Sequence, residues 1–297
     1  MTSERPFEVS AELYPFEDQW FVRDGVAMHF IDSGAGVPVV FFHGSPTWSF
    51  LYREVIGHLD GVRALSADMI GFGMSDKPAD FGYAPQDQSA WLGAWLDSLD
   101  LTPFVAVVQD WGGPIGLRAI LERSDRVAGL VIMNTWCWPP SRTLRVLSWL
   151  LGGPLGSMLM TWFPEQLVRG GMVAEAAKSH DVFAAYTAPF ETNRKGPMTL
   201  QRAIRQVDDW LEETEGMLHR VAHIPTELVW GTADKGLGDD ETLGRWQKHY
   251  PAARVTRLPH ASHFLQEDDP KAIADAVRRV VERVRHESTP SEIGAAS

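Results

Sequence analysis

The 297-residue sequence has little cysteine, no cluster of basic residues and no long apolar run. Its single cysteine, Cys137, excludes a disulfide framework and a zinc site built on cysteines. Lys and Arg number 27 against 39 Asp and Glu, and the net charge of −12 argues against nucleic acid or an anionic membrane surface as partner. The longest apolar runs, such as 37–42, are far shorter than the ~20 residues that span a bilayer.

The composition is otherwise that of a folded globular protein, with 44% hydrophobic and 22% charged residues. Residues 1–18 hold five acidic side chains and no apolar run of the length found in secretory signals. We therefore expect a cytoplasmic protein with a large apolar core that needs neither a disulfide nor a structural metal.

Short apolar runs alternate with helical patterns along most of the chain. Residues 37–42 are continuously apolar, which is typical of a strand covered on both faces. Residues 271–285 repeat apolar side chains at one-turn spacing, which predicts a helix with one buried face. The alternation predicts an α/β fold with a mostly parallel sheet flanked by helices. Further strands are predicted at 26–31, 62–67, 103–108, 127–133, 227–230 and 254–258, and further helices at 88–99 and 113–122.

The alternation stops near residue 135, and the next strand pattern begins at residue 227. The intervening segment has several helical patterns and no convincing strand. We expect an inserted helical cap at 135–215, over the carboxyl ends of the strands where open α/β sheets bind ligands, and a core formed by 1–134 and 216–297. Tryptophans in the cap fit either packing between helices or the wall of an apolar pocket. They are Trp136, Trp138, Trp149, Trp162 and Trp210.

The sharpest local signal is a buried strand that ends at Asp110 and is followed by Trp111, two glycines and a helix. This pattern predicts a nucleophile elbow, a tight strand-to-helix turn that exposes one side chain. The positive end of the helix dipole favours a negative charge at that point. Asp is also a favoured helix cap, so this segment alone leaves open whether Asp110 is a nucleophile or only a cap.

Two later strand ends supply the partners that a nucleophile needs. Asp234 follows the strand predicted at 227–230, and two histidines, His260 and His263, follow the strand predicted at 254–258. The chain order nucleophile, acid, histidine is the order found on the α/β-hydrolase sheet. His263 is the preferred base because an apolar residue and two acids follow it, and His260 is its competitor.

The turn at residues 43–45 follows the strand predicted at 37–42. On this fold, that turn supplies one of the two backbone N–H groups of the oxyanion hole. We therefore expect the N–H groups of Ser45 and Trp111 to form the hole. The glycine-containing segment 68–75 is interpreted as a structural turn at a strand end.

The segment Gln109-Asp110-Trp111-Gly112 resembles the elbow of the haloalkane dehalogenases, and the resemblance extends from about residue 10 to residue 285. It implies an α/β-hydrolase fold with a mostly parallel eight-stranded sheet and an inserted helical cap. It also implies that Asp110 is the nucleophile, His263 the base and Asp234 the acid that supports it, while Trp111 holds the halide. The other segments that carry the resemblance are 43–53, 185–190, 234–238 and 263–267.

The chemistry explains why the elbow carries Asp rather than Ser. A carboxylate can displace halide from an sp³ carbon and form an alkyl ester, which water activated by His263 then cleaves. Serine would form an ether, which that water could not cleave. The leaving halide needs hydrogen-bond donors, and an indole N–H such as that of Trp111 only donates.

The resemblance has one departure, at the second halide donor. Some relatives carry Asn at the position of Ser45, and others use a tryptophan of the cap. The Ser45 side chain is too short to copy an Asn amide. The candidates for the second donor are Ser45 itself or a cap tryptophan, Trp138, Trp149 or Trp162. The alternative is a weakened halide site and a different substrate. No cofactor and no metal are expected, and the implied partners are a small apolar halogenated substrate, water and a halide ion.

Other activities on this scaffold are distinguished by single residues. An epoxide hydrolase would need two cap tyrosines as acids, and the expected cap contains only Tyr186. A fluoroacetate dehalogenase would carry Arg where Trp111 stands, and a serine esterase is excluded by Asp110. A catalytically silent relative is disfavoured because nucleophile, base and acid are all retained, whereas a cofactor-free oxygenase like the luciferases on this scaffold stays an alternative.

Overall fold

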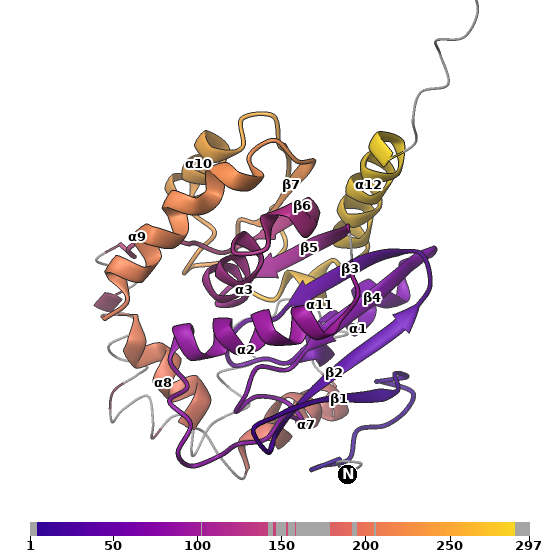
Figure 1. Cartoon of the computed structure of the whole chain (residues 1–297), viewed down its shortest axis with the longest axis vertical. Helices are drawn as coiled ribbons and strands as arrows, with labels where there is room; N and C mark the ends of the chain where they lie inside the picture. The colour runs from indigo at the N-terminus through magenta and orange to yellow at the C-terminus, as the bar shows by residue number, and fades with distance from the viewer. Residues whose placement is uncertain are drawn as a thin grey trace, which may run out of the picture.

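The computed structural model describes residues 5–101, 103–141, 145–146, 153, 158, 179–191, 195–204 and 206–288. Its centre is an eight-stranded sheet with the order β1-β2-β4-β3-β5-β6-β7-β8 (Figure 1). The pairs β1–β2 and β2–β4 are antiparallel, and every later pair is parallel. The strands are β1 (Asp18–Arg23), β2 (Val26–Gly34), β3 (Val37–Phe42), β4 (Val62–Ala67), β5 (Phe104–Gln109), β6 (Val127–Met133), β7 (Thr226–Gly231) and β8 (Arg254–Leu258).

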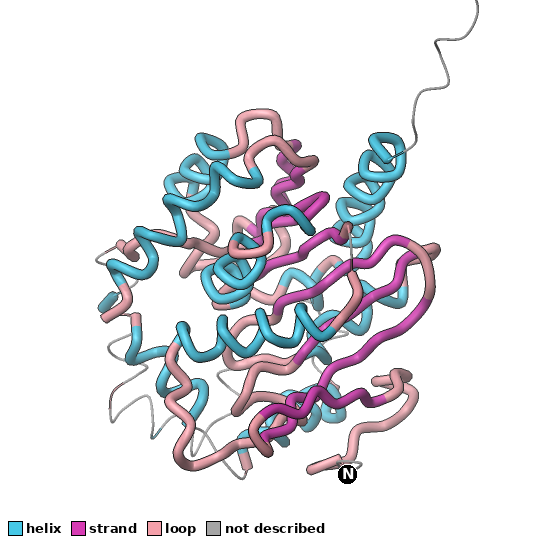
Figure 2. The backbone as a smooth tube through the Cα atoms, viewed as in Figure 1, coloured by secondary structure: helices cyan, strands magenta, loops and turns pink. Residues whose placement is uncertain are grey.

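Helices cover both faces of this sheet (Figure 1, Figure 2). One face packs against α2 and α3, and the other packs against α1, α11 and α12. The helices on the sheet are α1 (Arg53–Gly57), α2 (Pro85–Ser98), α3 (Gly112–Leu121), α10 (Asp240–His249), α11 (Leu265–Asp268) and α12 (Pro270–Ser288). The others are η1 (Ser49–Tyr52), η2 (Ser124–Arg126), α7 (His180–Thr187), η4 (Ala188–Phe190), α8 (Lys195–Ala203), α9 (Asp208–Met217) and η5 (Leu218–Val221).

The central strands are apolar on both faces because each face meets a layer of helices. In β3, Val40 and Phe42 join the core on the α2–α3 side, whereas Val39 and Phe41 join the core on the α12 side. This double burial explains the continuous apolar run in the sequence. Because β3 to β8 run parallel, their carboxyl ends lie at one edge of the sheet, where the loops that carry the site begin.

The predicted fold class is confirmed, and most predicted strands lie within a residue or two of the observed ones. The strand β1 went unpredicted because its side chains are only half-buried or exposed at the sheet edge. Within 135–215, the described residues include α7, η4, α8 and the start of α9, and none of them forms a strand. The bounds of the cap domain stay a prediction. Trp149 and Trp162 lie outside the described residues.

Among the described residues, no helix is both long enough and apolar enough to cross a bilayer. The cytoplasmic location expected from the sequence stays a prediction.

The segment 68–75 forms a turn at a strand end, as expected, and the buried side chain of His29 connects it to β1 and β2. Asp68 accepts the backbone N–H groups of Ser49 and Met74 at 2.7 and 2.9 Å. It also contacts His29 Nδ1 at 2.9 Å, while His29 Nε2 contacts Asp18 at 3.1 Å. Burial by itself lowers the pKa of His29, but the two carboxylates outweigh it and raise that pKa above its usual value. His29 therefore links β1, β2 and the loop after β4 through its contacts with Asp18 and Asp68.

Replacing His29 with glutamine should destabilise the fold by about 3–5 kcal/mol, the usual cost of removing one partner from a buried ion pair. Because the pKa of His29 is raised by folding, its contribution is complete below the unfolded-state pKa of about 6.5 and is lost as pH rises through the folded-state pKa. Guanidinium unfolding at pH 6 and pH 9 measures the free energy of unfolding of wild type and of His29→Gln at each pH. The gap between wild type and His29→Gln should be larger at pH 6. An equal gap at both pH values would contradict this role of His29.

Candidate active site

Asp110 occupies the strand-to-helix turn between β5 and α3, in the left-handed backbone region with φ of 48°. Such a conformation is costly for most residues but tolerated by Asp and Asn. Neighbouring backbone holds it in place: the Asp110 N–H donates to the Asn134 carbonyl at 3.2 Å, and its own carbonyl accepts the Thr135 hydroxyl at 2.6 Å. The turn that the sequence predicts as an elbow is therefore present, and it is tied to the end of β6.

The loop after β3 lies directly against the Asp110 side chain. A Cβ built on Gly44 would lie 2.5 Å from Cβ and Oδ1 of Asp110, so only glycine allows this approach. The next residue, Ser45, donates its backbone N–H to Asp110 Oδ1 at 2.8 Å. His43 stabilises the loop, since its Nδ1 contacts the Gly44 carbonyl at 2.8 Å and its Nε2 accepts the Met69 N–H at 2.9 Å. Ser45 is thus in place for one half of an oxyanion hole.

The two candidate histidines have different surroundings in the structure. His263 Nε2 lies 3.4 Å from Asp110 Oδ2, and its Nδ1 lies 2.8 Å from Asp234 Oδ2. His260 instead has an exposed side chain that contacts Asp269 at 3.1 Å. The amide of Gln109 donates to the His263 carbonyl at 3.0 Å and so anchors the histidine loop to the end of β5. His263, and not His260, therefore lies between the carboxylates of Asp110 and Asp234.

Asp234 is buried and fully supplied with hydrogen bonds. Its Oδ1 accepts the N–H groups of Gly236 and Leu237 at 2.8 and 3.2 Å, and its Oδ2 accepts the Asn134 amide at 3.0 Å as well as His263. Burial raises the pKa of Asp234, but the charge and hydrogen bond of His263 and these donors together lower it below its usual range. Asp234 therefore stays ionised. The support from Asn134 was not anticipated from the sequence.

The two carboxylates also control the proton on His263. Burial would lower the pKa of His263, but Asp234 and Asp110 outweigh it and raise that pKa well above the usual value. Removing the charge of Asp110, as esterification would do, removes one of the two groups that hold the proton. The pKa of His263 would then fall, which favours the neutral form of the imidazole.

The tryptophans near the elbow divide into two groups. Trp111 is buried, and its ring meets the ring of Trp136 edge to face with 5.1 Å between the centroids. Trp138 packs 4.9 Å from the ring of Trp246 and under the Arg245 guanidinium. Trp136 was not among the halide donors considered from the sequence, where it read as one cap tryptophan among five.

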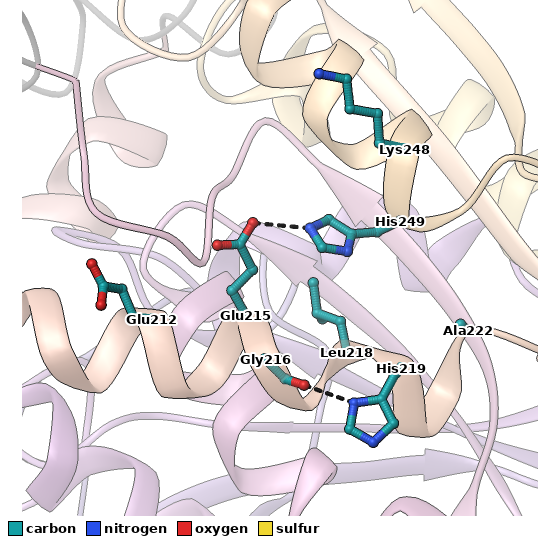
Figure 3. Close-up of a pocket in the computed structure, with 8 residues that line it drawn as sticks. All are labelled: Glu212, Glu215, Gly216, Leu218, His219, Ala222, Lys248 and His249. Atoms are coloured by element: carbon teal, nitrogen blue, oxygen red, sulfur yellow. Dashed lines mark hydrogen bonds and ion pairs between the residues drawn. The ribbon is translucent and has the colours of Figure 1, made fainter.

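A surface groove of about 480 Å³ lies elsewhere, between the end of α9, η5 and α10 (Figure 3). Its Glu215 contacts His249 at 2.9 Å and Arg245 at 2.6 Å. Charged side chains line this groove, and none of Asp110, Asp234 or His263 is among its lining residues. It does not have the apolar character of a haloalkane site. The lining residues are Glu212, Glu215, Gly216, Leu218, His219, Ala222, Lys248 and His249.

Comparison with known proteins agrees with this geometry. A family model described as the alpha/beta hydrolase fold matches residues 37–270, a range that includes Asp110, Asp234 and His263. The chain is 34% identical over 279 residues to haloalkane dehalogenase 2 of Mycobacterium tuberculosis, covering 91% of this chain and 97% of that relative. It is 31% identical over 297 residues to cis-3-alkyl-4-alkyloxetan-2-one decarboxylase of Shewanella oneidensis, covering 94% and 91%.

Solved structures of haloalkane dehalogenases also match this chain. The crystal structure of the haloalkane dehalogenase DatA from Agrobacterium tumefaciens C58 matches with a TM-score of 0.79 and 25% identity, covering 90% of this chain and 97% of that one. A crystal structure of DbjA matches with a TM-score of 0.81, also at 25% identity, covering 91% and 99%. Together with the elbow and the sheet order, these similarities show that the chain belongs to the haloalkane dehalogenase family of the α/β hydrolases.

Proposed function

We propose that this protein hydrolyses haloalkanes to an alcohol and a halide ion through an alkyl ester of Asp110. The observation that carries the proposal is the continuous line from Asp110 Oδ2 through His263 to Asp234, at 3.4 and 2.8 Å. A carboxylate at an elbow, facing a histidine held by a second carboxylate, suits nucleophilic attack followed by base-assisted hydrolysis.

In the first step, Asp110 Oδ2 attacks the carbon that bears the halogen. Ser45 N–H holds Oδ1, which leaves Oδ2 as the oxygen that forms the new C–O bond. The carbon–halogen bond breaks, and its electron pair leaves with the halide. The indole N–H of Trp111 would stabilise that developing anion, and the surrounding burial strengthens the interaction. No proton moves in this step.

In the second step, His263 takes a proton from a water molecule, and the water oxygen attacks Cγ of the Asp110 ester. Negative charge develops on Oδ1, where the Ser45 N–H already lies at 2.8 Å. The N–H of Trp111 is proposed as the second donor to this oxyanion. Asp234 stabilises the charged His263 until the intermediate collapses. The Cγ–Oδ2 bond then breaks, Oδ2 takes the proton from His263 and leaves as the alcohol, and the Asp110 carboxyl group that remains releases its proton to solvent.

Halide release from 1-bromobutane or 1,2-dibromoethane tests the proposed function directly. Each turnover releases one proton with one bromide, so the pH of a weakly buffered solution should fall in step with bromide production. A matched mixture containing inactive protein gives the background rate. No bromide above that background from either compound would contradict the proposal.

An epoxide hydrolase activity has one remaining candidate acid in the expected cap, Tyr186. Its hydroxyl donates to Glu267, whose carboxylate also pairs with Arg53 at 2.9 Å. Burial and the Glu267 charge raise the pKa of Tyr186 well above its usual value, which makes it a poorer acid. The hydroxyl therefore already forms a hydrogen bond that joins α7 to α11. This contact disfavours its use as an acid in epoxide opening.

Replacing Tyr186 with phenylalanine should therefore leave halide release within a few-fold of wild type. It should lower the free energy of unfolding by about 1–3 kcal/mol, because Glu267 loses a buried hydrogen-bond donor. Steady-state kinetics and urea unfolding measure the two effects. A large loss of activity with unchanged stability would instead assign the Tyr186 hydroxyl to the chemistry.

A second candidate function is decarboxylation of a four-membered lactone. The similarity to the oxetan-2-one decarboxylase covers 94% of this chain. The observation that favours it is the side chain of Ser45, a short hydroxyl at the position where the resemblance implies an Asn amide in some haloalkane dehalogenases. Asp110 would attack the sp³ ring carbon that bears the ring oxygen, and the C–O bond would break to leave a carboxylate in place of a halide. Loss of carbon dioxide from that carboxylate would then form a carbon–carbon double bond and expel Asp110 as the free carboxylate. Two separate incubations distinguish the functions. A decarboxylase would release carbon dioxide from a cis-3,4-dialkyl oxetan-2-one and no bromide from 1-bromobutane, and a dehalogenase would do the reverse.

A further inference from the structure

The second halide donor can be sought from the geometry, on the assumption that the proposed dehalogenation is correct. A halide leaving a carbon takes a full negative charge into a buried site, where each added donor has a large effect. Trp111 offers a single N–H. The side chains next to Trp111 therefore decide how well the anion is held.

Trp136 is placed at the elbow by the residues that precede it. Asn134 accepts the Asp110 N–H through its carbonyl, and the Thr135 hydroxyl donates to the Asp110 carbonyl. The ring of Trp136 then meets Trp111 with an interplanar angle of 67°. Only 3% of Trp136 is exposed to solvent. The end of β6 thus brings a second indole against the first, beside the nucleophile.

The indole nitrogen of Trp136 is buried and has no hydrogen-bond partner among the described residues. Other buried tryptophans are satisfied, since Trp48 Nε1 donates to the Ala185 carbonyl at 3.1 Å and Trp246 Nε1 to the Thr135 carbonyl at 2.7 Å. A buried donor without an acceptor is unfavourable, so an exception calls for a reason.

Location separates Trp136 from other tryptophans with an unpartnered nitrogen. Trp95 and Trp230 share that property, but they lie on α2 and β7 and their rings do not pack against Trp111. Trp138 packs against Trp246, on α10. The Ser45 hydroxyl is also buried without a described partner, and it is the direct competitor.

We propose that Trp136 is the second halide-binding donor, acting with Trp111 on the anion released when Asp110 is alkylated. The acceptor that its Nε1 needs is the halide itself. The donor comes from the loop after β6 and lies only two residues beyond Asn134, which also supports Asp234. One short segment therefore serves both the acid and the leaving group.

The test compares bromide binding and bromide release in matched variants. Trp136→Phe keeps an aromatic ring against Trp111 and removes the N–H, and Trp95→Phe makes the same change at an unpartnered indole in the α2 core. Titration calorimetry with sodium bromide measures binding without turnover, and single-turnover kinetics with 1-bromobutane measures ester formation. Both should weaken by about tenfold to a hundredfold in Trp136→Phe, and both should stay within about twofold in Trp95→Phe.

Thermal unfolding of each variant shows whether it is folded, and the ester-hydrolysis rate of Trp136→Phe should be unchanged because the halide has already been displaced. Equal binding and release in Trp136→Phe and Trp95→Phe would overturn the inference while leaving the proposed function standing. The inference also fails if wild type binds no bromide, or if Ser45→Ala shows the loss and Trp136→Phe does not. Weakened bromide binding in Trp136→Phe, with no bromide release by wild type, would support the donor and contradict dehalogenation.

Discussion

Replacing Asp110 with asparagine will abolish halide release, with a loss on the order of 10⁴-fold or more, the scale seen when a nucleophile is removed. Asparagine is preferable to alanine because it tolerates the left-handed backbone at φ of 48° and keeps an oxygen for the Ser45 N–H. Its neutral amide is a poor nucleophile towards an alkyl halide. Bromide release from 1-bromobutane is the measurement.

Asp97→Asn is a suitable control, because this exposed carboxylate pairs with Arg123 and Arg126 on the surface. It should keep wild-type activity, since exposed ion pairs contribute little. Unfolding curves for both variants show whether the fold is intact. Halide release by Asp110→Asn within tenfold of wild type would remove Asp110 from the mechanism.

The second large effect is expected at His263, where glutamine should stop the reaction halfway. Attack by Asp110 requires no proton transfer, whereas attack by water requires a base. The variant should therefore release one bromide per chain and then stall as the alkyl ester. Intact-protein mass spectrometry after incubation with 1-bromobutane should show the added mass of one butyl group.

His260→Gln provides the matched control, because it makes the same change three residues earlier on an exposed side chain. This variant should turn over normally and show no added mass. An unmodified mass in His263→Gln, combined with an ester in His260→Gln, would reverse the assignment of the base. An unmodified mass in both would contradict the ester intermediate.

Much of this architecture was predictable because the sequence marks it locally. The strands at 37–42, 62–67, 127–133 and 254–258 have their predicted bounds, since each apolar run is flanked by turn-forming or helical residues. The strand β1 was not predictable in this way. It is an edge strand with little burial, and within the described sheet it pairs with β2 alone.

The site was predictable to the extent that it follows the ends of strands. Asp110, Asp234 and His263 each come after a parallel strand, so their meeting at one edge follows from the topology. The sequence also favoured His263 over His260, and the structure places His263 between Asp110 and Asp234. Gln109 and Asp268 hold its loop by hydrogen bonds to the backbone.

The environment of the Trp136 side chain could not be predicted from the sequence. A tryptophan that begins a helical segment reads equally well as core or as pocket wall. Only its position against Trp111 and its unpartnered nitrogen indicate a donor, and both depend on how β6 and the elbow pack together. The same holds for the Asn134 amide that supports Asp234.

One turnover in water labelled with oxygen-18 shows whether water attacks Asp110 or the substrate. Attack at Cγ should place the label in the Asp110 carboxylate, found by mass spectrometry of the peptide that contains it, and the alcohol should carry unlabelled oxygen from Oδ2. Labelled alcohol with an unlabelled Asp110 would show direct displacement of halide by water and would contradict the covalent mechanism.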